Sequence, residues 1–393
     1  MAANPVEAGP PPMGRPLSVI LLPTLECNVA CDYCFEEKSK IRLGALQLPL
    51  LTERLLDHMA ERGSALAEVY WQGGEVMLLG PAWFERAHEI MGTLAQARHM
   101  RFQHHLQTNL IGWSPRWHGV VKSMFGGVLG TSMDYPNVHR RLKNGSTNRY
   151  TELWLRAVAD AQAAGISPGC IAVLHKATLE AGPEAFYRFY TETARITDFQ
   201  VNMPFPGGPG EGGDTLEPGP LARFLNSLMD VWVERGLLHG IRLGPFDQLL
   251  EAFSGRPARL PCIWLQNCAN EFISIDARGQ SALCDCWVTS YPEHGFGNVL
   301  GTGGLSEMLG ASEARLRFLE RPEHLMDDEE CGTCPWLSMC HGGCPVRTFT
   351  ALGTISAKDP YCEAYKALFS HARRVASQVA RAAYSPLQRS TTP

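Results

Sequence analysis

Apolar and polar positions follow two periods along roughly the first 240 residues of the chain. Short apolar runs with the length of buried strands fall at residues 17–22, 67–71, 102–107, 127–133, 169–174 and 198–203. Between these runs, apolar residues recur at helical spacing, as at Leu51, Leu55 and Met59 before Gly63. Alternating strands and helices with short connections predict a parallel sheet with right-handed crossovers.

Six strand–helix units are too few to close an eight-stranded barrel, so we expect an α/β fold with an open, partial (β/α)6 barrel. The loops at the carboxyl ends of its strands should carry the chemistry. A glycine- and proline-rich segment, 204–220, follows the sixth strand, and we interpret it as a connector or as a lid over the barrel mouth. A helix is expected at 218–236.

The pattern changes beyond about residue 258, where short strands, turns and cysteines replace the long elements. Residues 272–283 are typical of a hairpin with Gly279 in its turn, and a last helix is expected beyond about residue 375. The predicted organisation is a disordered proline-rich leader (1–16), the barrel (17–245), a small cysteine-rich domain (246–375) and a C-terminal tail (376–393).

Composition narrows the functional classes. The 393 residues are enough for two domains with cores of their own. A formal net charge of −5 offers no basic surface to nucleic acid, and no apolar run is long enough to span a membrane. The N-terminus lacks the basic start and apolar core of a secretory signal. Because thiols stay reduced in the cytoplasm, we expect the chain, with its 13 cysteines, to be cytoplasmic.

Cys27, Cys31 and Cys34, followed at once by Phe35, open the loop after the first predicted strand. Three thiolates can hold three irons of a 4Fe–4S cluster and leave the fourth iron open to a small molecule, whereas electron-transfer clusters are held by four cysteines. The spacing therefore indicates chemistry at iron. A zinc knuckle or scattered cytosolic thiols are the alternatives.

Later cysteines in the C-terminal third suffice for two fully ligated 4Fe–4S clusters. They are Cys262, Cys268, Cys284, Cys331, Cys334, Cys340, Cys344 and Cys362. A disulfide scaffold is a poor alternative, because such scaffolds are short and secreted. Two zinc sites are the stronger alternative, since four-cysteine zinc sites also use C-x2-C pairs. Cys170 and Cys286 are left over.

The two groups of cysteines together resemble a known family. The first three resemble the signature of the radical S-adenosylmethionine superfamily, and the later ones resemble its SPASM auxiliary-cluster domain, with the spacing of the anaerobic sulfatase-maturating enzymes. The similarity covers roughly residues 17–370. It implies one 4Fe–4S cluster that binds S-adenosyl-L-methionine, two auxiliary 4Fe–4S clusters, and a 5′-deoxyadenosyl radical that abstracts hydrogen from an unactivated carbon.

The resemblance also implies which residues bind the cofactor. Gly73, Gly74 and Glu75 match the family's GGE motif and should meet the methionine ammonium. Further matches at strand ends are Gln107, Asn109, Ser132 and Asp134. The family's His-Asp-x-x-Arg pattern is altered here, so the arginine for the methionine carboxylate corresponds to Arg141 or is replaced by Lys143.

For the auxiliary clusters, the resemblance implies two ligand sets. The set nearer the active site is Cys262, Cys268, Cys284 and Cys344, and the outer set is Cys331, Cys334, Cys340 and Cys362. Asp285 stands where the sulfatase maturases have a base for the substrate proton; a solvated loop aspartate is the alternative. Strand alternation would point Cys286 to the same side as Cys284, where its thiol could return a hydrogen atom to a substrate radical. A small buried hydrophobe is the alternative for Cys286.

Enzymes with this pair of domains commonly oxidise, cross-link or epimerise a side chain of a peptide or protein. The resemblance therefore favours a maturase that performs oxidation or cross-linking, with a flavodoxin- or ferredoxin-type electron donor. The alternative is a dehydrogenase or epimerase of an aminosugar-like small molecule. An iron–sulfur electron carrier is disfavoured, because no fourth cysteine lies near residues 27–34.

Overall fold

The computed structural model describes residues 16–206 and 214–389, so most of the predicted leader and the middle of segment 204–220 lie outside the described residues. Its strands are β1 (Leu17–Leu22), β2 (Leu66–Trp71), β3 (Arg101–Thr108), β4 (Val128–Ser132), β5 (Ser167–Val173), β6 (Asp198–Asn202), β7 (Arg242–Gly244), β8 (Phe272–Asp276), β9 (Gln280–Ala282) and β10 (Gly297–Asn298). Its α-helices are α1 (Gln47–Glu61), α2 (Pro81–Gln96), α3 (His118–Met124), α4 (Thr147–Ala163), α5 (Lys176–Ala181), α6 (Pro183–Arg188), α7 (Pro218–Arg235), α8 (Phe246–Phe253), α9 (Asp285–Ser290), α10 (Leu305–Ala311), α11 (Glu313–Asp327), α12 (Glu329–Gly332), α13 (Leu337–Cys340), α14 (Pro345–Leu352) and α15 (Cys362–Arg389).

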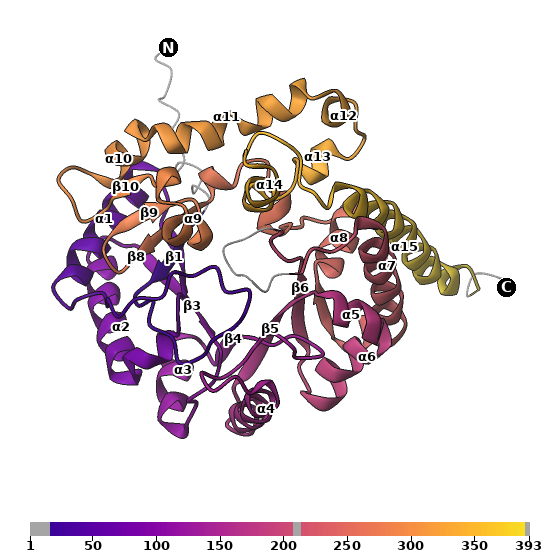
Figure 1. The fold of residues 1–393 in the computed structure, drawn as a ribbon, viewed down its shortest axis with the longest axis horizontal. Helices are drawn as coiled ribbons and strands as arrows, with labels where there is room; N and C mark the ends of the chain where they lie inside the picture. Colours follow the sequence, from indigo (N-terminus) through magenta and orange to yellow (C-terminus); the bar gives the residue numbers. More distant parts are fainter. Residues whose placement is uncertain (1–15, 207–213, 390–393) are drawn as a thin grey trace, which may run out of the picture.

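The strands of the described residues form one sheet in the order β10-β9-β8-β1-β2-β3-β4-β5-β6-β7. β1 to β7 pair in parallel with their neighbours, and β8 is also parallel to β1. Figure 1 shows the strands in an arc, with α1, α2, α4 and α6 on its outer side. The six predicted strands are confirmed as β1 to β6, and so is the α/β parallel-sheet class.

The sheet extends beyond six units at both edges. The hairpin of the predicted cysteine-rich domain, β8–β9, joins the barrel sheet through β1. Ser18 lies opposite Phe272, and Leu22 lies opposite Asp276. This pairing satisfies backbone groups that β1 would otherwise expose at an edge. Gly279 adopts φ +83° in the predicted hairpin turn.

The predicted helical stripes face the core. Leu51, Leu55 and Met59 of α1 are buried, and α7 ends at Arg235, one residue before the expected end. These helices cover the outer face of the strands, as the apolar spacing requires.

The last helix begins earlier than the sequence predicts. α15 starts at Cys362 instead of near residue 375, and residues 376–389 of the expected tail continue it. The reason is a buried stripe that begins at Tyr365, Leu368 and Phe369. Through it, α15 packs against α7 and α8 (Figure 1).

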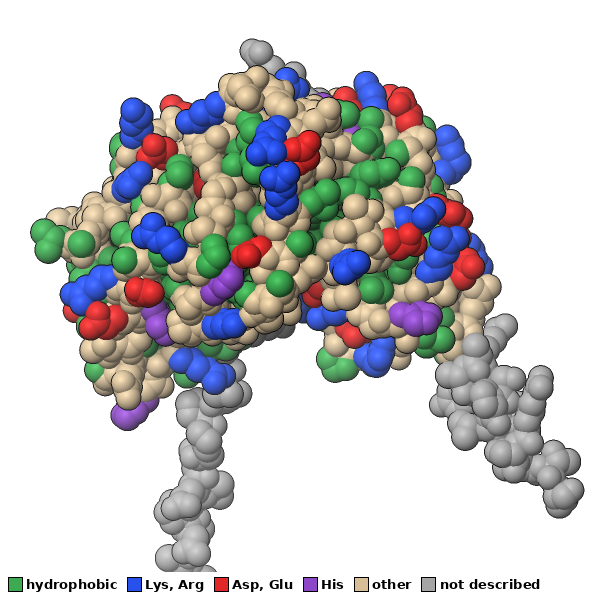
Figure 2. Space-filling view, turned by 90° about the horizontal axis from the view of Figure 1, so that it is seen from below, with side chains coloured by type: hydrophobic (Ala, Val, Ile, Leu, Met, Phe, Trp, Pro, Cys, Tyr) green, Lys and Arg blue, Asp and Glu red, His purple; other side chains and the backbone are tan. Residues whose placement is uncertain are grey.

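The surface carries both signs of charge. Figure 2 shows Lys and Arg side chains interspersed with Asp and Glu over the face seen from below, without a continuous basic area on that face. Among the described residues, no helix is long and apolar enough to cross a membrane.

A buried histidine joins the barrel to the cysteine-rich region. The Nδ1 atom of His58, in α1, lies 2.6 Å from the hydroxyl of Ser306, in α10. Burial lowers the pKa of His58 from 6.5 to about 4. Because the folded-state pKa lies below the unfolded value, neutral His58 contributes stability above pH 6.5, and this contribution is lost as the pH falls toward 4.

Between pH 7.5 and pH 5.5, we expect the wild-type protein to lose about 1 kcal/mol more stability than the His58→Gln variant. Glutamine keeps a polar group for Ser306 but does not titrate in this range. Urea unfolding at the two pH values measures the difference, and equal losses in the two proteins would contradict the role of His58.

Candidate active site

The loop after β1 carries Cys27, Cys31 and Cys34. Cys27 is buried, and the side-chain amide of Asn109 points at its sulfur from 4.0 Å. Backbone hydrogen bonds hold the loop against residues 139–141. All three thiols are free, and Cys31 lies close enough to interact electrostatically with the other two. The structure therefore brings the predicted triad together.

Gly73 and Gly74 follow β2 and pack against the start of this loop. The Gly74 N–H donates to the Thr24 carbonyl at 3.1 Å. A Cβ on Gly73 would lie 2.6 Å from the same carbonyl oxygen, and a Cβ on Gly74 would lie 2.4 Å from that of Glu26. Gly73 also has φ +127°, which favours glycine. Both glycines are required for the close approach of β2 to the cysteine loop; their contact with a methionine ammonium stays a prediction.

Glu75 is buried, and its carboxylate joins the ends of β2 and β3. Oε1 accepts hydrogen bonds from the Thr108 hydroxyl at 2.7 Å and the Met77 N–H at 2.9 Å, and Oε2 accepts one from the Asn109 N–H at 2.8 Å. Burial raises the pKa of Glu75, and these hydrogen bonds oppose the rise. A carboxylate has about four acceptor positions, so one remains on Oε2 for a cation.

Gln107 and Ser132 meet across β3 and β4. The Gln107 side-chain amide donates to the Ser132 hydroxyl at 2.8 Å. A Cβ on Gly130 would lie 2.1 Å from Gln107 Oε1, so glycine leaves room for this amide. The Asn109 amide donates to the side-chain oxygen of Asn28 at 2.8 Å. These polar side chains thus lie at adjacent strand ends beside the cysteine loop.

Asp134 belongs to a buried network that the sequence does not reveal. Its Oδ2 accepts hydrogen bonds from Arg140 Nε at 3.0 Å and from the Tyr33 hydroxyl, and its Oδ1 accepts one from the Val173 N–H at 2.9 Å. Asp134 is 0% exposed, and Arg140 balances its charge. The network fixes the loop of Tyr33 to the ends of β4 and β5; a contact between Asp134 and a cofactor stays a prediction.

The two basic residues predicted to bind the methionine carboxylate have different surroundings. Arg141 forms an ion pair with Asp32 in the cysteine loop, whereas Lys143 is exposed. Which of the two meets a cofactor carboxylate stays a prediction.

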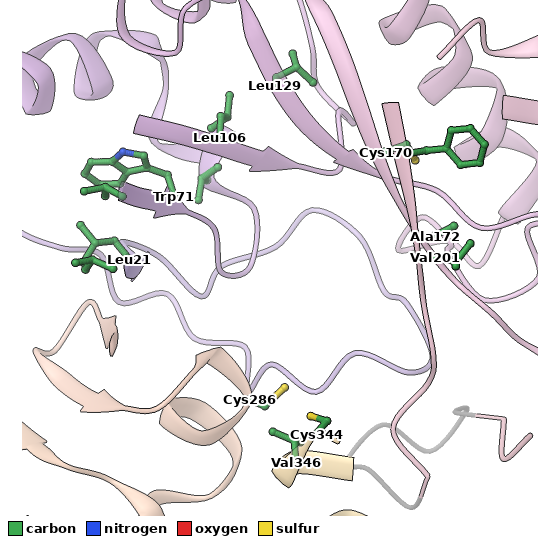
Figure 3. Packing of buried hydrophobic residues seen from close by; sticks show 14 of the residues in the cluster. Leu21, Trp71, Leu106, Leu129, Cys170, Ala172, Val201, Cys286, Cys344 and Val346 are labelled. Carbon is green, nitrogen blue, oxygen red and sulfur yellow. The ribbon is translucent and has the colours of Figure 1, made fainter. Parts of the chain in front are cut away.

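A cavity of about 300 Å³ separates the strand ends from the cysteine-rich region. The thiols that line it include the predicted inner set, Cys262, Cys268, Cys284 and Cys344. Apolar side chains such as Phe35 and Phe272 line it as well. Figure 3 shows Cys286 and Cys344 side by side, from α9 and the start of α14, apart from the packed side chains of Leu21 and Trp71.

Asp285 faces the same cavity from the first residue of α9. Its Oδ2 accepts a hydrogen bond from the Gln72 side-chain amide at 2.7 Å. Burial raises the pKa of Asp285. Burial and then the charge of Asp285 raise the pKa of Glu36, which lies beside it. Two neighbouring carboxyl groups in a desolvated site favour a protonated form, so this pair is suited to receive a proton.

Cys286 lines the cavity for a different reason from the one predicted. The chain turns into α9 at Asp285, so strand alternation does not apply there. The Cys286 thiol is buried close to Cys284 and Cys344. The leftover Cys170 is buried in β5.

The outer set lies in a second, smaller cavity. Its lining includes Cys331, Cys334, Cys340 and Cys362. The structure therefore groups the eight later cysteines as the resemblance implies, four to each cavity.

Buried thiols at these sites need a positive partner to ionise. Burial raises the pKa values of Cys27 and Cys331 to about 11. Unpaired thiolates would be costly there, and a metal centre compensates their charge. Converging free thiols without a disulfide therefore fit iron–sulfur clusters.

Sequence reasoning missed several polar residues of the site. Gln72 and Glu36 directly flank recognised motifs, and this proximity could have identified them. His139, His175 and Asp214 line the cavity with ligand atoms within 4.8 Å of one another. Nothing in their spacing along the chain predicts that they meet.

Comparison with known proteins shows what the whole chain is similar to. No protein-family model matches the chain. The cysteine-type anaerobic sulfatase-maturating enzyme of Clostridium perfringens strain 13 is 25% identical over 381 residues, which cover 91% of this chain and 96% of that enzyme. The serine-type enzyme of Bacteroides thetaiotaomicron is 22% identical over 387 residues, or 92% of this chain and 90% of that enzyme.

The solved structure of native anSMEcpe with bound AdoMet and Cp18Cys peptide shares this fold, with a TM-score of 0.78 and 23% identity over 93% of this chain and 99% of that one. The chain is a radical S-adenosylmethionine enzyme. It is related to the anaerobic sulfatase-maturating enzymes along nearly its whole length, and its cysteine-rich C-terminal region matches theirs. In this radical S-adenosylmethionine enzyme, the loop of Cys27 and the cavity of Asp285 meet at one end of the sheet.

We expect Glu75→Gln to lower both the stability and the affinity for S-adenosyl-L-methionine. Glutamine would place an NH₂ group where Glu75 has a carboxylate oxygen. This donor would face the N–H and O–H groups that now donate to Glu75, which costs about 1–3 kcal/mol at a buried site. Thermal unfolding and titration calorimetry measure the two effects, with Glu53→Gln on the exposed side of α1 as the control. A Glu75→Gln protein that matches this control in both would contradict the assignment.

Proposed function

We propose that this enzyme oxidises or cross-links a side chain of a peptide or protein. The observation that carries the proposal is the single cavity that gathers Asp285, the inner thiols and aromatic side chains of the Cys27 loop. A substrate in this cavity would lie between a site for S-adenosyl-L-methionine and a site for an auxiliary cluster.

The cysteine sets supply the ligands. Cys27, Cys31 and Cys34 would hold the cluster that binds S-adenosyl-L-methionine, and the inner and outer sets would hold two auxiliary 4Fe–4S clusters. When bound, the cofactor supplies a 5′-deoxyadenosyl radical that abstracts a hydrogen atom from the substrate. Support for the cofactor comes from the related structure that contains AdoMet.

The residues around the cavity would position the substrate and exclude water. Apolar side chains, among them Phe35, Phe205 and Phe272, form much of the wall. A dry wall protects a reactive radical from side reactions. Glu75 and the adjacent glycines would bind the methionine ammonium, with Gln107, Asn109, Ser132 and Asp134 at neighbouring strand ends.

Asp285 would accept the proton that a two-electron oxidation releases. Gln72 holds one carboxylate oxygen at 2.7 Å, so the side chain is oriented before substrate binds. The elevated pKa of Asp285, caused by burial, makes the carboxylate a better proton acceptor. The hydrogen atom, the proton and one electron then leave the substrate to three separate acceptors.

A peptide is the substrate class that the relatives support. Their names are those of cysteine-type and serine-type sulfatase-maturating enzymes, and anSMEcpe has been solved with a peptide. The reductant would be a flavodoxin- or ferredoxin-type protein, and the enzyme would act in the cytoplasm.

The position of Cys286 supports a second candidate function. Its buried thiol lines the cavity, where it would return a hydrogen atom to a substrate radical and leave an isomer. The enzyme would then be an epimerase, and its substrate would be a peptide or an aminosugar-like small molecule.

The mass of the product distinguishes the two reactions. With short peptides that contain one serine or one cysteine, we expect deoxyadenosine formation and a product oxidised by two electrons, without deuterium from heavy water. Asp285→Asn should lower product formation by roughly 100-fold or more, because general-base catalysis is lost. Cys286→Ala should retain it. An isomeric product with one solvent deuterium, lost in Cys286→Ala, would overturn oxidation in favour of epimerisation.

A further inference from the structure

Arg321, in α11, connects the two cysteine cavities. It is 6% exposed, and its guanidinium donates hydrogen bonds to four backbone carbonyls. The acceptors are Ile355 at 2.7 Å, His341 at 3.0 Å, Gly342 at 3.0 Å and Ala357 at 3.2 Å.

These carbonyls belong to the segments that carry the cluster ligands. His341 and Gly342 lie between Cys340 of the outer set and Cys344 of the inner set, and residues 355–357 precede Cys362 of the outer set. One side chain therefore fixes the relative position of both sets.

The charge of Arg321 is not balanced by a carboxylate. Among the described residues, Arg321 forms no ion pair, although its donors are satisfied by carbonyls. Among acidic groups, the thiols of Cys268 and Cys344 interact most strongly with its charge, followed by the carboxyl of Asp359 and the thiol of Cys340. Burying an unpaired cation is costly unless an anion lies near it.

Arg347 provides the contrast. It is equally buried, but its Nε donates to Asp359 at 2.9 Å and its Nη2 donates to the Tyr365 hydroxyl at 2.8 Å. The Arg347–Asp359 pair is close to neutral as a unit. The charge of Arg347 also acts on the thiols of Cys344 and Cys262, but it is paired with Asp359, whereas Arg321 has no carboxylate in an ion pair among the described residues.

We propose that Arg321 is the shared counter-charge of the two auxiliary clusters and raises their reduction potentials. This inference rests on the proposed function, because it requires clusters at both cysteine sets. A fixed cation stabilises the more negative, reduced state of a nearby cluster, and the potential of an iron–sulfur cluster depends on local charge and hydrogen bonding. An electron that leaves the substrate would then be accepted more readily.

The test uses the full chain with Cys27, Cys31 and Cys34 replaced by alanine, so that only auxiliary clusters are observed. In this background, Arg321→Gln removes the charge and Arg321→Lys keeps it. Arg317→Gln, an exposed position one turn away on α11, is the matched control. Iron content and the midpoint potentials from a redox titration followed by electron paramagnetic resonance are measured.

We expect about eight irons per chain in the background protein, as two 4Fe–4S clusters require. Arg321→Gln should shift at least one midpoint to a more negative potential, while Arg321→Lys and Arg317→Gln stay near the background value. Lower iron content in Arg321→Gln than in Arg321→Lys would also support a role for the charge.

Two results would overturn the inference. One is an Arg321→Gln protein that keeps its irons and has the same midpoint potentials as the background protein. The other is an equal loss of iron in Arg321→Gln and Arg321→Lys, which would make Arg321 a clamp for backbone carbonyls only. A background protein without auxiliary iron would instead contradict the proposed function itself.

Discussion

The parallel pairing of β8 with β1 is the constraint on which the rest of the structure depends. β1 leads into the loop of Cys27, and β8 begins the hairpin that leads to Cys284 and α9. Because both strands lie in the same sheet, the cysteine loop and the cysteine-rich region cannot move independently. The cavity between them, and the place of Asp285 in it, follow from this pairing.

Buried charge is the second determinant of the site. Asp134 is balanced by Arg140 and Asp359 by Arg347, so two carboxylates are neutralised within the protein. Burial disfavours the charged form of the thiols as well, and it raises the pKa of Cys340 to about 12. In the proposed clusters, cationic iron would compensate the thiolates, and the net negative charge of each cluster would balance Arg321.

The sequence predicts the features that depend on residues close together in the chain. The strands of the barrel appear in the sequence because each is a short apolar run between amphipathic helices, and the cysteine sets appear because ligand spacing is fixed by cluster geometry. The pairing of β1 with β8 could not be predicted, since it joins residues far apart in the chain. The Asp134–Arg140 pair was also missed, because charged residues in a loop do not reveal burial. The early start of α15 is not evident from the sequence, because Cys362 is read as a cluster ligand and the apolar stripe starts only after it.

The central claim is that the protein binds three separate iron–sulfur clusters, two of them beside one substrate cavity. Anomalous diffraction at the iron edge, from crystals of the protein reconstituted without oxygen and soaked with S-adenosyl-L-methionine, tests it directly. The account predicts three groups of iron peaks: one at Cys27, Cys31 and Cys34, one at the inner cysteines and one at the outer cysteines. Absence of iron from the inner cysteines, or a zinc edge at either auxiliary set, would contradict it.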